Sequence, residues 1–216
     1  NGPVDDVSLV DNLIGIKKFK NMINFNTYPS IEAQISAISD DIAYNNHDIQ
    51  DGIKANLFKL EDLIEIQFFK EIYKSYKSNI KKKEKNIIIY QIIRDSINLM
   101  VEDVINNTLL NIKDNKIKKY SDIINNKKQI VSFSNKFKSI EQEIKLFLRL
   151  KMYNNRSVLN KNNNGKKIIT KLFFEISKKP KKYINNYKNK DQFRSISDYI
   201  SGMTDRYAIQ LHKSLK

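Results

Sequence analysis

The chain has 216 residues, enough for one domain with a real core or a sizeable piece of a larger one, and its 40% hydrophobic content excludes disorder by composition. Cysteine is absent, which excludes disulfides, thiolate metal sites and cysteine nucleophiles and fits a reducing cytoplasm. The net charge of +15 has two explanations: attraction to polyanions such as nucleic acid, or the Lys, Asn and Ile enrichment of an AT-rich genome, which we favour.

Five Gly and three Pro are few helix breakers for this length, so the sequence predicts an all-α fold. No apolar run approaches the roughly 20 residues that a membrane span needs. Because the first residue is Asn1, the start is expected to be an internal position of a longer polypeptide. The predicted helices, from apolar spacing and capping residues, cover 9–21, Ser30 to about Asp51 with Gly52 as the stop, 58–78, a long and largely buried 85–113, 138–153, 165–177 and 192–214. The segments expected to be loops or irregular are 116–136, 160–167 and 178–191.

The segment 33–51, AQISAISDDIAYNNHDIQD, has two opposite faces if it is helical. A helix turns about 100° per residue, so Asp40, Tyr44 and Asp48 fall on one side. The isoleucines at 31, 35, 38, 42 and 49 fall on the other side as an apolar stripe. Acids opposite an apolar stripe are usual on a surface helix, and composition alone favours that interpretation. Repelling aspartates in a helix, where Asp is a poor helix former, argue for a functional site instead.

The neighbours His47 and Asp48 have the residue types of metal ligands, but adjacent helical side chains diverge by about 100°. One His with scattered Asp is therefore a weak metal signal by itself. A calcium loop is excluded, because the aspartates do not alternate as an EF-hand requires.

The stretch EAQISAISDDIAYNNHDIQDGI resembles the signature helix of the bacterial deoxyguanosine triphosphate triphosphohydrolase-like proteins, which are HD-domain phosphohydrolases. The opening NGP, the segment SINLMVEDVI and the segments 127–153 and 197–215 resemble the same family. The resemblance covers essentially the whole chain and corresponds to the C-terminal part of a family member. It implies an all-α, helical fragment of the HD superfamily. Residues 1–115 would be the C-terminal part of the HD-type catalytic domain, and residues 116–216 the C-terminal helical phosphohydrolase-associated region.

The resemblance implies cleavage of a dNTP, dGTP-like, to the deoxynucleoside and inorganic triphosphate with a divalent metal such as Mg or Mn. An Asp-x-x-x-Tyr-x-x-x-Asp pattern of the family falls here on Asp40, Tyr44 and Asp48. It implies that Asp40 is a metal ligand and that Tyr44 and Asp48 bind the substrate near the sugar. His47 would then be a supporting residue. The family also implies a homo-oligomer, and we expect a cytoplasmic location, which the absence of cysteine fits.

The chain departs from the family pattern in one important respect. The family's first His and its His-Asp doublet have no counterpart here, because only His47 and His212 are present and neither has the expected neighbours. We therefore expect no catalytic residue in this chain, most metal ligands outside it, and no activity of the 216 residues alone. The alternatives are a basic helical module that binds nucleotide or nucleic acid, or a non-catalytic remnant. Nothing in the sequence supports a nucleic-acid partner beyond the charge, and no membrane partner is expected.

Overall fold

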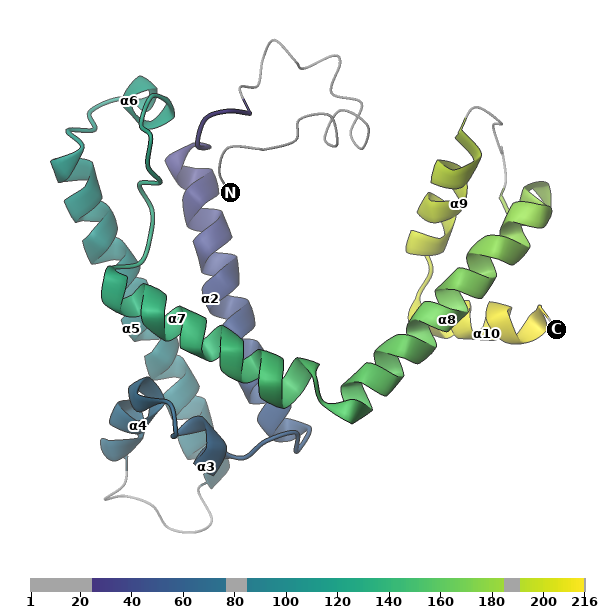
Figure 1. Ribbon diagram of the computed structural model, residues 1–216, viewed down its shortest axis with the longest axis horizontal. Coiled ribbons are helices and arrows are strands. Elements are labelled where there is room, and N and C mark those ends of the chain that lie inside the picture. The colour runs from purple at the N-terminus through teal and green to yellow at the C-terminus, as the bar shows by residue number, and fades with distance from the viewer. Residues whose placement is uncertain (1–24, 77–84, 185–190, 216) are drawn as a thin grey trace. The chain divides into compact units, whose positions relative to one another are not determined.

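The computed structural model describes residues 25–76, 85–184 and 191–215, and all regular structure within them is helical, without a strand (Figure 1). The predicted all-α fold is thereby confirmed, while the predicted helix over 9–21 lies outside the described residues. No helix in these described ranges is both long enough and apolar enough to span a membrane. The elements are α2 (Ile31–Lys54), α3 (Leu60–Leu63), α4 (Gln67–Lys74), α5 (Lys85–Asp114), α6 (Tyr120–Ile124), α7 (Asn135–Leu148), the π-helical η4 (Arg149–Tyr153), α8 (Arg156–Lys178), the 3₁₀ turn η5 (Pro180–Lys182), α9 (Gln192–Ser201) and α10 (Asp205–Ser214).

The chain folds as two compact units, residues 1–152 and residues 153–216. Each has a hydrophobic cluster of its own. The predicted division between residues 115 and 116 concerns family modules, and it stays a prediction.

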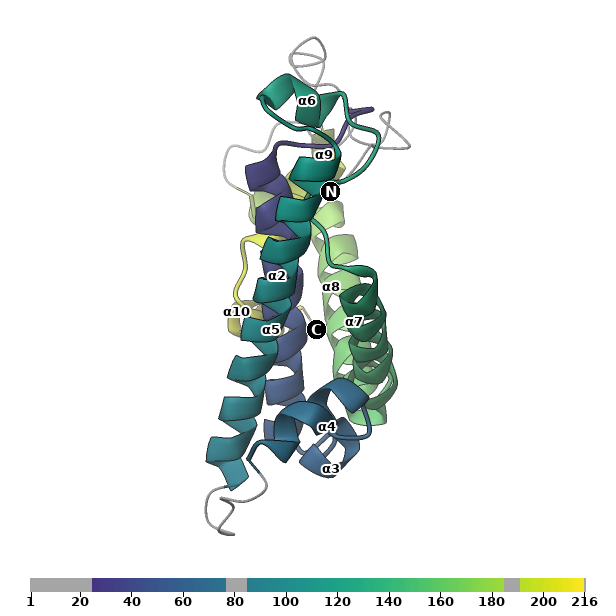
Figure 2. The ribbon, with the colours of Figure 1, turned by 90° about the vertical axis from the view of Figure 1, so that its left-hand side faces the viewer.

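The first unit is built on α2 and α5, which run side by side in opposite directions (Figure 2). Helix α4 packs on α5, and α7 packs on α2. Apolar side chains from all four helices and the short α3 meet in one core, whose most completely buried members include Ile49, Leu63, Phe69, Ile92, Met100, Val131, Ile144 and Leu148.

Helix α5 confirms the predicted long helix but not its predicted burial. One side contributes Ile92 and Met100 to the core. The other side leaves Val101, Ile105 and Leu109 exposed. The helix is apolar on most of its circumference, whereas its described neighbours cover only one side of it.

Polar side chains of α5 fix the irregular segment 130–134. Asp103 accepts hydrogen bonds from the backbone N–H and the hydroxyl of Ser134, at 2.8 and 2.6 Å. One and two turns further on, Asn107 and Asn111 donate to the backbone carbonyls of Ser132 (2.7 Å) and Ile130 (2.8 Å). The spacing of four residues places all three side chains on one face of the helix, which explains how this segment is ordered without forming a helix.

The predicted helix over 58–78 is two short helices instead. The carboxylate of Asp62 accepts the backbone N–H of Lys59 at 2.8 Å, which starts α3. Ile66 then takes an extended conformation (φ −70°, ψ 120°) that starts α4 in a new direction. The break lets Leu63 and Ile66 both enter the core. A sequence pattern with apolar residues every three or four positions does not reveal such a bend.

Gly52 was predicted to end α2, and this prediction is wrong, because the helix continues to Lys54 with Ala55 as its C-terminal cap. Gly52 is buried inside the helix, where the ring of Phe58 lies against it. A Cβ atom at this position would come 2.2 Å from Cε1 of that ring. The glycine is therefore required by the close approach of Phe58 and not by the end of the helix.

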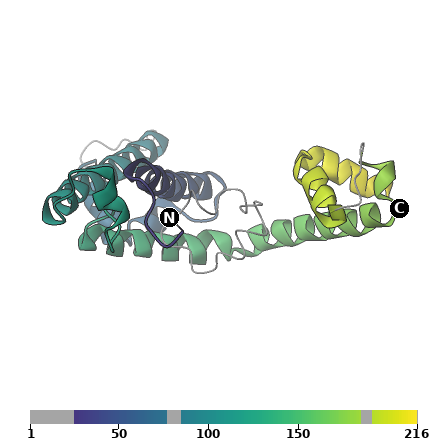
Figure 3. The same cartoon turned by 90° about the horizontal axis from the view of Figure 1, so that it is seen from above.

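The second unit consists of α8 with α9 and α10 packed on one side of it (Figure 3). Its core is small and contains Leu172, Ile176, Ile196, Ile200 and Ala208. Two predictions are wrong here. The tract 160–167 was expected to be a loop, but it is part of α8, which begins at Arg156 after the cap Asn155. The single helix over 192–214 is divided, because Gly202 ends α9 and the Thr204 hydroxyl caps α10 by accepting the Tyr207 N–H at 3.3 Å.

Candidate functional site

The candidate site is the acidic face of α2, which begins where the sequence predicts. The Ser30 hydroxyl accepts the backbone N–H of Ala33 at 3.3 Å and caps the helix. Glu32 follows in the first turn, where its own backbone N–H and the Ser30 hydroxyl lower the pKa of its carboxyl group. Both features satisfy free N–H groups at the helix start. These local contacts determine where α2 begins, and therefore which residues form its acidic face.

The two faces of α2 are arranged as the 100° spacing predicts. Ile42 and Ile49 are buried in the core, whereas Asp40 and Tyr44 are exposed, Tyr44 by 68%. Asp48 is half-buried on the same side as Asp40. The apolar stripe is shorter than predicted, because its member Ile35 is 46% exposed.

The sequence pattern did not reveal that three amide side chains of α2 are buried, those of Gln34, Asn45 and Asn46. Gln34 donates to the Pro29 carbonyl at 2.8 Å and accepts the backbone N–H groups of Ile130 and Val131, both at 3.0 Å. This single side chain holds the start of α2 against a segment nearly 100 residues later. An amide between apolar positions is the only signal in the sequence, and it does not identify the partner.

The other two buried amides are less completely bonded. Asn46 donates from Nδ2 to the Ile42 carbonyl at 2.8 Å and lies 3.6 Å from the sulfur of Met100. Within the part of the chain that the structure describes, Asn46 Oδ1 and Asn45 Nδ2 have no hydrogen-bond partner. Both residues lie on the side of α2 that faces the core, away from Asp40, so they do not extend the acidic face.

Next to Asp40, Asp41 is engaged in an ion pair between helices. Lys145 of α7 lies with its Nζ 3.6 Å from Asp41 and 2.5 Å from Glu141. Burial lowers the pKa of Lys145, but its hydrogen bond and charge interaction with Glu141, aided by Asp41, raise it by more, so the net pKa lies above its usual value. Asp41 is thus part of the contact between α2 and α7. By contrast, the Asp40 carboxylate makes no hydrogen bond or ion pair with the described residues.

The described residues do not contain a complete metal site. No group of three or more His, Asp or Glu side chains gathers anywhere among them. The two histidines belong to different units, His47 to α2 and His212 to α10. An exposed carboxylate without a partner is a donor of the type that Mg²⁺ and Mn²⁺ prefer, so Asp40 fits a metal as one ligand among several and not as the whole site.

A separate cleft of about 680 Å³ lies elsewhere on the first unit, between α4, α5 and α7. Its floor includes Phe68 and Phe137, and its rim carries Glu71, Asp95 and Glu143. None of Asp40, Tyr44 and Asp48 lines it. The acidic face of α2 is therefore a surface and not the wall of this cleft.

Comparisons with known proteins agree on one family. Residues 131–214 match the phosphohydrolase-associated domain. The whole chain is 63% identical to a deoxyguanosinetriphosphate triphosphohydrolase-like protein of Pelagibacter ubique and spans 58% of that protein's length. Proteins of the same description from Leptospira interrogans (39% identical over 87% of the chain) and a Caulobacter species (30% over the whole chain) are similar as well, with 51% and 57% of their lengths covered. The chain therefore spans little more than half the length of these curated relatives.

Proposed function

The chain belongs to the deoxyguanosinetriphosphate triphosphohydrolase-like proteins, and on this premise we propose that it contributes to a metal-dependent enzyme that hydrolyses a dNTP to the deoxynucleoside and inorganic triphosphate. The name of the relatives supports the substrate class. Their greater length supports an enzyme that is longer than these 216 residues. Because dNTPs are drawn from the nucleotide pool of the cell, we expect a cytoplasmic location, and we expect a homo-oligomer from the family.

Asp40 has the role of a metal ligand in this proposal. Its carboxylate is exposed and without a partner among the described residues, so it is free to bind an ion. A bound divalent ion polarises a phosphoryl group and lowers the pKa of a bound water. The remaining ligands, a His and a His-Asp doublet by resemblance, are expected outside this chain. The 216 residues alone are expected to show no turnover, and phosphate release from dGTP with Mn²⁺ by this chain would contradict that.

Tyr44 and Asp48 have the role of substrate-binding residues. Each successive position in the set Asp40, Tyr44 and Asp48 lies about 6 Å further along the helix, because four residues rise by that distance. A row that begins at a metal therefore extends about 12 Å, which suits contacts with the sugar of a nucleotide whose phosphates lie at the metal. His47 is exposed on the neighbouring side of α2 and supports the row without binding the metal.

One observation carries the proposal: the Asp40 carboxylate has no partner among the described residues and is exposed on the side of α2 opposite the buried Ile42 and Ile49. A metal ligand needs this orientation, because its carboxylate has to reach the ion. The neighbouring Asp41, by comparison, forms an ion pair with Lys145.

The test is Asp40→Ala in the full-length protein. We expect loss of Mn²⁺-dependent triphosphate release from dGTP by more than about 100-fold, because even residues that only support metal ligands cost 10- to 100-fold when removed. The bound metal content should fall in parallel. The matched control is Asp51→Ala, which removes a carboxylate of the same helix whose ion-pair partner is Lys54, at 3.9 Å. Full activity and full metal content of Asp40→Ala would exclude the proposed role.

A further inference from the structure

The cleft between α4, α5 and α7 has the size of a ligand site. Its volume of about 680 Å³ lies within the range of roughly 300–1,000 Å³ that is usual for small-molecule sites. Each of the three helices gives it an apolar wall, through Ile72, Leu99 and Ile140. Leu99 is 39% exposed, although the other side of α5 lies in the core. Among the described residues, this hollow therefore leaves apolar surface uncovered.

The floor of the cleft is a packed group of aromatic rings. The Phe137 ring meets Phe68 edge-on at 5.8 Å and stacks on Phe133 at 6.4 Å, with 17° between the ring planes. The Ser134 hydroxyl accepts the Phe137 N–H at 3.4 Å, and Asp103 of α5 in turn holds Ser134. These contacts fix the position of the Phe137 ring, so the shape of the floor does not depend on a ligand.

The Phe137 ring already has a cation beside it. The ammonium group of Lys136 lies 6.0 Å from the centroid of this ring. The face of an aromatic ring is electron-rich and attracts cations at such distances. Lys136 itself is exposed at the edge of the cleft. The floor is therefore a surface that accommodates positive charge beside apolar groups.

Two carboxylates of the rim lack a compensating cation. Glu71 of α4 accepts a hydrogen bond from the neutral side chain of Gln67 at 3.0 Å. Glu143 of α7 makes no hydrogen bond or ion pair with the described residues. The third acid of the rim, Asp95, differs from both, because Nε of Arg94 lies 3.7 Å from its carboxylate. The rim thus presents negative charge from two different helices.

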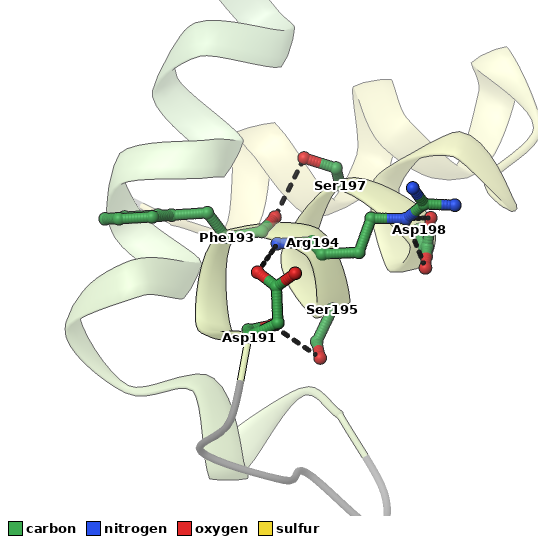
Figure 4. A network of polar contacts seen from close by, with 6 residues as sticks. All are labelled: Asp191, Phe193, Arg194, Ser195, Ser197 and Asp198. Atoms are coloured by element: carbon green, nitrogen blue, oxygen red, sulfur yellow. Dashed lines mark hydrogen bonds and ion pairs between the residues drawn. The ribbon is translucent and has the colours of Figure 1, made fainter. Parts of the chain in front are cut away.

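The acids of α9 show how surface carboxylates are more commonly engaged. The Asp191 carboxylate caps the helix by accepting the Arg194 N–H at 3.1 Å (Figure 4). Arg194 Nε also bonds both oxygens of Asp198, at 2.9 and 3.1 Å. Neither Glu71 nor Glu143 has such a partner among the described residues, so their charges are available to a ligand.

We propose that this cleft binds a small organic cation, with the apolar body of the ligand on the floor of Phe68 and Phe137 and its positive charge at Glu71 and Glu143. Ligand sites commonly combine an apolar lining with a few polar groups that fix the orientation of the ligand. None of the residues proposed for dNTP hydrolysis lines the cleft, so this proposal is independent of the proposed hydrolase activity.

Other occupants fit the cleft less well. A nucleotide or another phosphate-bearing ligand would meet two uncompensated carboxylates, which repel it. A partner helix about 10 Å in diameter fills roughly 400 Å³ per turn, so the cleft holds less than two turns of one. Helices that bind in grooves use anchors over two turns. The observations therefore favour a small cation.

The test is a fluorescence titration of the full chain with dansylcadaverine, which joins an aromatic body to a primary ammonium group, at about 50 mM salt. The matched probe is N-acetyl-dansylcadaverine, which keeps the aromatic body and lacks the charge. We expect the cationic probe to bind at least about fivefold more tightly, because two carboxylates attract its ammonium group. This preference would identify the rim, since a chain with a net charge of +15 otherwise repels cations.

Two variants separate the rim of the cleft from its floor. Glu71→Gln/Glu143→Gln keeps the shape of both side chains and should reduce the preference for the cationic probe to less than about twofold. The affinity for the acetylated probe should stay the same. Leu99→Trp places a larger side chain in the cleft and should weaken the binding of both probes by at least about tenfold.

The matched control is Glu65→Gln/Glu102→Gln, the same loss of charge at two exposed acids of the first unit that do not line the cleft. It should keep the full preference, and circular dichroism should show unchanged helix content in every variant. An equal loss in the control would mean that only net charge matters and would overturn the assignment to the cleft. So would undiminished binding by Leu99→Trp. Equal affinity for the two probes, or no binding of the cationic probe up to about 1 mM, would overturn the proposal.

Discussion

The two units use the same helical elements but are held together differently. In the first unit, buried amides and carboxylates join segments far apart in the chain, as Gln34 does with Ile130 and Val131. In the second unit, side chains bond residues nearby in the chain, as in the hydrogen bond from Gln192 to the Ser177 carbonyl, 15 positions away. The comparison teaches that the unit with the acidic helix depends on distant residues, whereas the second unit depends on local caps and a small core.

The largest expected effect tests the hydrogen bonds between Gln34 and the distant residues Ile130 and Val131. Gln34→Ala leaves the N–H groups of Ile130 and Val131 buried without an acceptor, and each unsatisfied group costs about 1–3 kcal/mol. We expect the free energy of unfolding of the first unit to fall by about 3 kcal/mol, measured by urea denaturation followed by circular dichroism. The control Gln142→Ala removes an exposed glutamine of α7 and should change it by less than about 0.5 kcal/mol. A loss below about 1 kcal/mol for Gln34→Ala would show that these hydrogen bonds do not stabilise the first unit as expected.

Replacing one glycine in each unit by alanine gives the next largest effect. The change in the free energy of unfolding is expected to have opposite signs in the two units. Gly52→Ala places a methyl group 2.2 Å from the Phe58 ring, which is itself held edge-on by Phe147 at 4.9 Å. We expect a loss of about 2 kcal/mol, because the strain of overpacking exceeds the gain in helix propensity. Gly165→Ala meets nothing within 4 Å in α8 and should stabilise the second unit by about 1 kcal/mol.

Thermal unfolding of both variants measures this contrast. Adding Phe58→Leu to Gly52→Ala should cost less than the sum of the two single changes, because the smaller side chain relieves the close approach. Strictly additive losses would show that the ring does not limit position 52. A destabilised Gly165→Ala would show that the pocket between α8 and α10, which Gly165 lines, does not accommodate the added methyl group.

The smallest expected effect concerns pH. The hydrogen bond between the hydroxyls of Tyr199 and Tyr207, 3.3 Å apart, raises the pKa of Tyr199 to about 12. The folded state thus favours the neutral phenol, and this contribution to stability is present below pH 10 and is lost as the pH rises from 10 to about 12. Tyr207→Phe should lower the pKa of Tyr199 toward its ordinary value, as an ultraviolet absorbance titration would measure. An unchanged titration curve would mean that the two hydroxyls do not interact.

Sequence reasoning located the elements whose signals are local. Ser30 begins α2 because a hydroxyl cap acts within three residues, and the length of α5 follows from its continuous apolar run. Sequence reasoning failed where a distant or competing contact determines the local structure. Gly52 has the residue type of a helix stop, but Phe58 explains its presence. The Asn- and Lys-rich tract 160–167 has the composition of a loop, yet the Asn155 cap and the apolar residues beyond it make it the first half of α8.

The candidate site was predictable in orientation but not in its surroundings. The 100° spacing alone placed Asp40 and Tyr44 opposite the buried Ile42. The ion pair of Asp41 with Lys145 joins residues more than 100 positions apart, so no local pattern distinguished Asp41 from Asp40. The metal and substrate roles of Asp40, Tyr44 and Asp48 stay predictions.

The bonds of Gln34 also set an order of events during synthesis. The side-chain oxygen of Gln34 accepts hydrogen bonds from N–H groups that lie 96 and 97 residues later in the chain. At translation rates of about 5–20 residues per second, helix α2 leaves the ribosome about 5–20 s before its partners exist. During that interval the helix that carries the acidic face lacks its final anchor. A nascent chain halted before Ile130 therefore presents α2 without that anchor, and such an intermediate is a natural substrate for chaperones that hold unfinished domains.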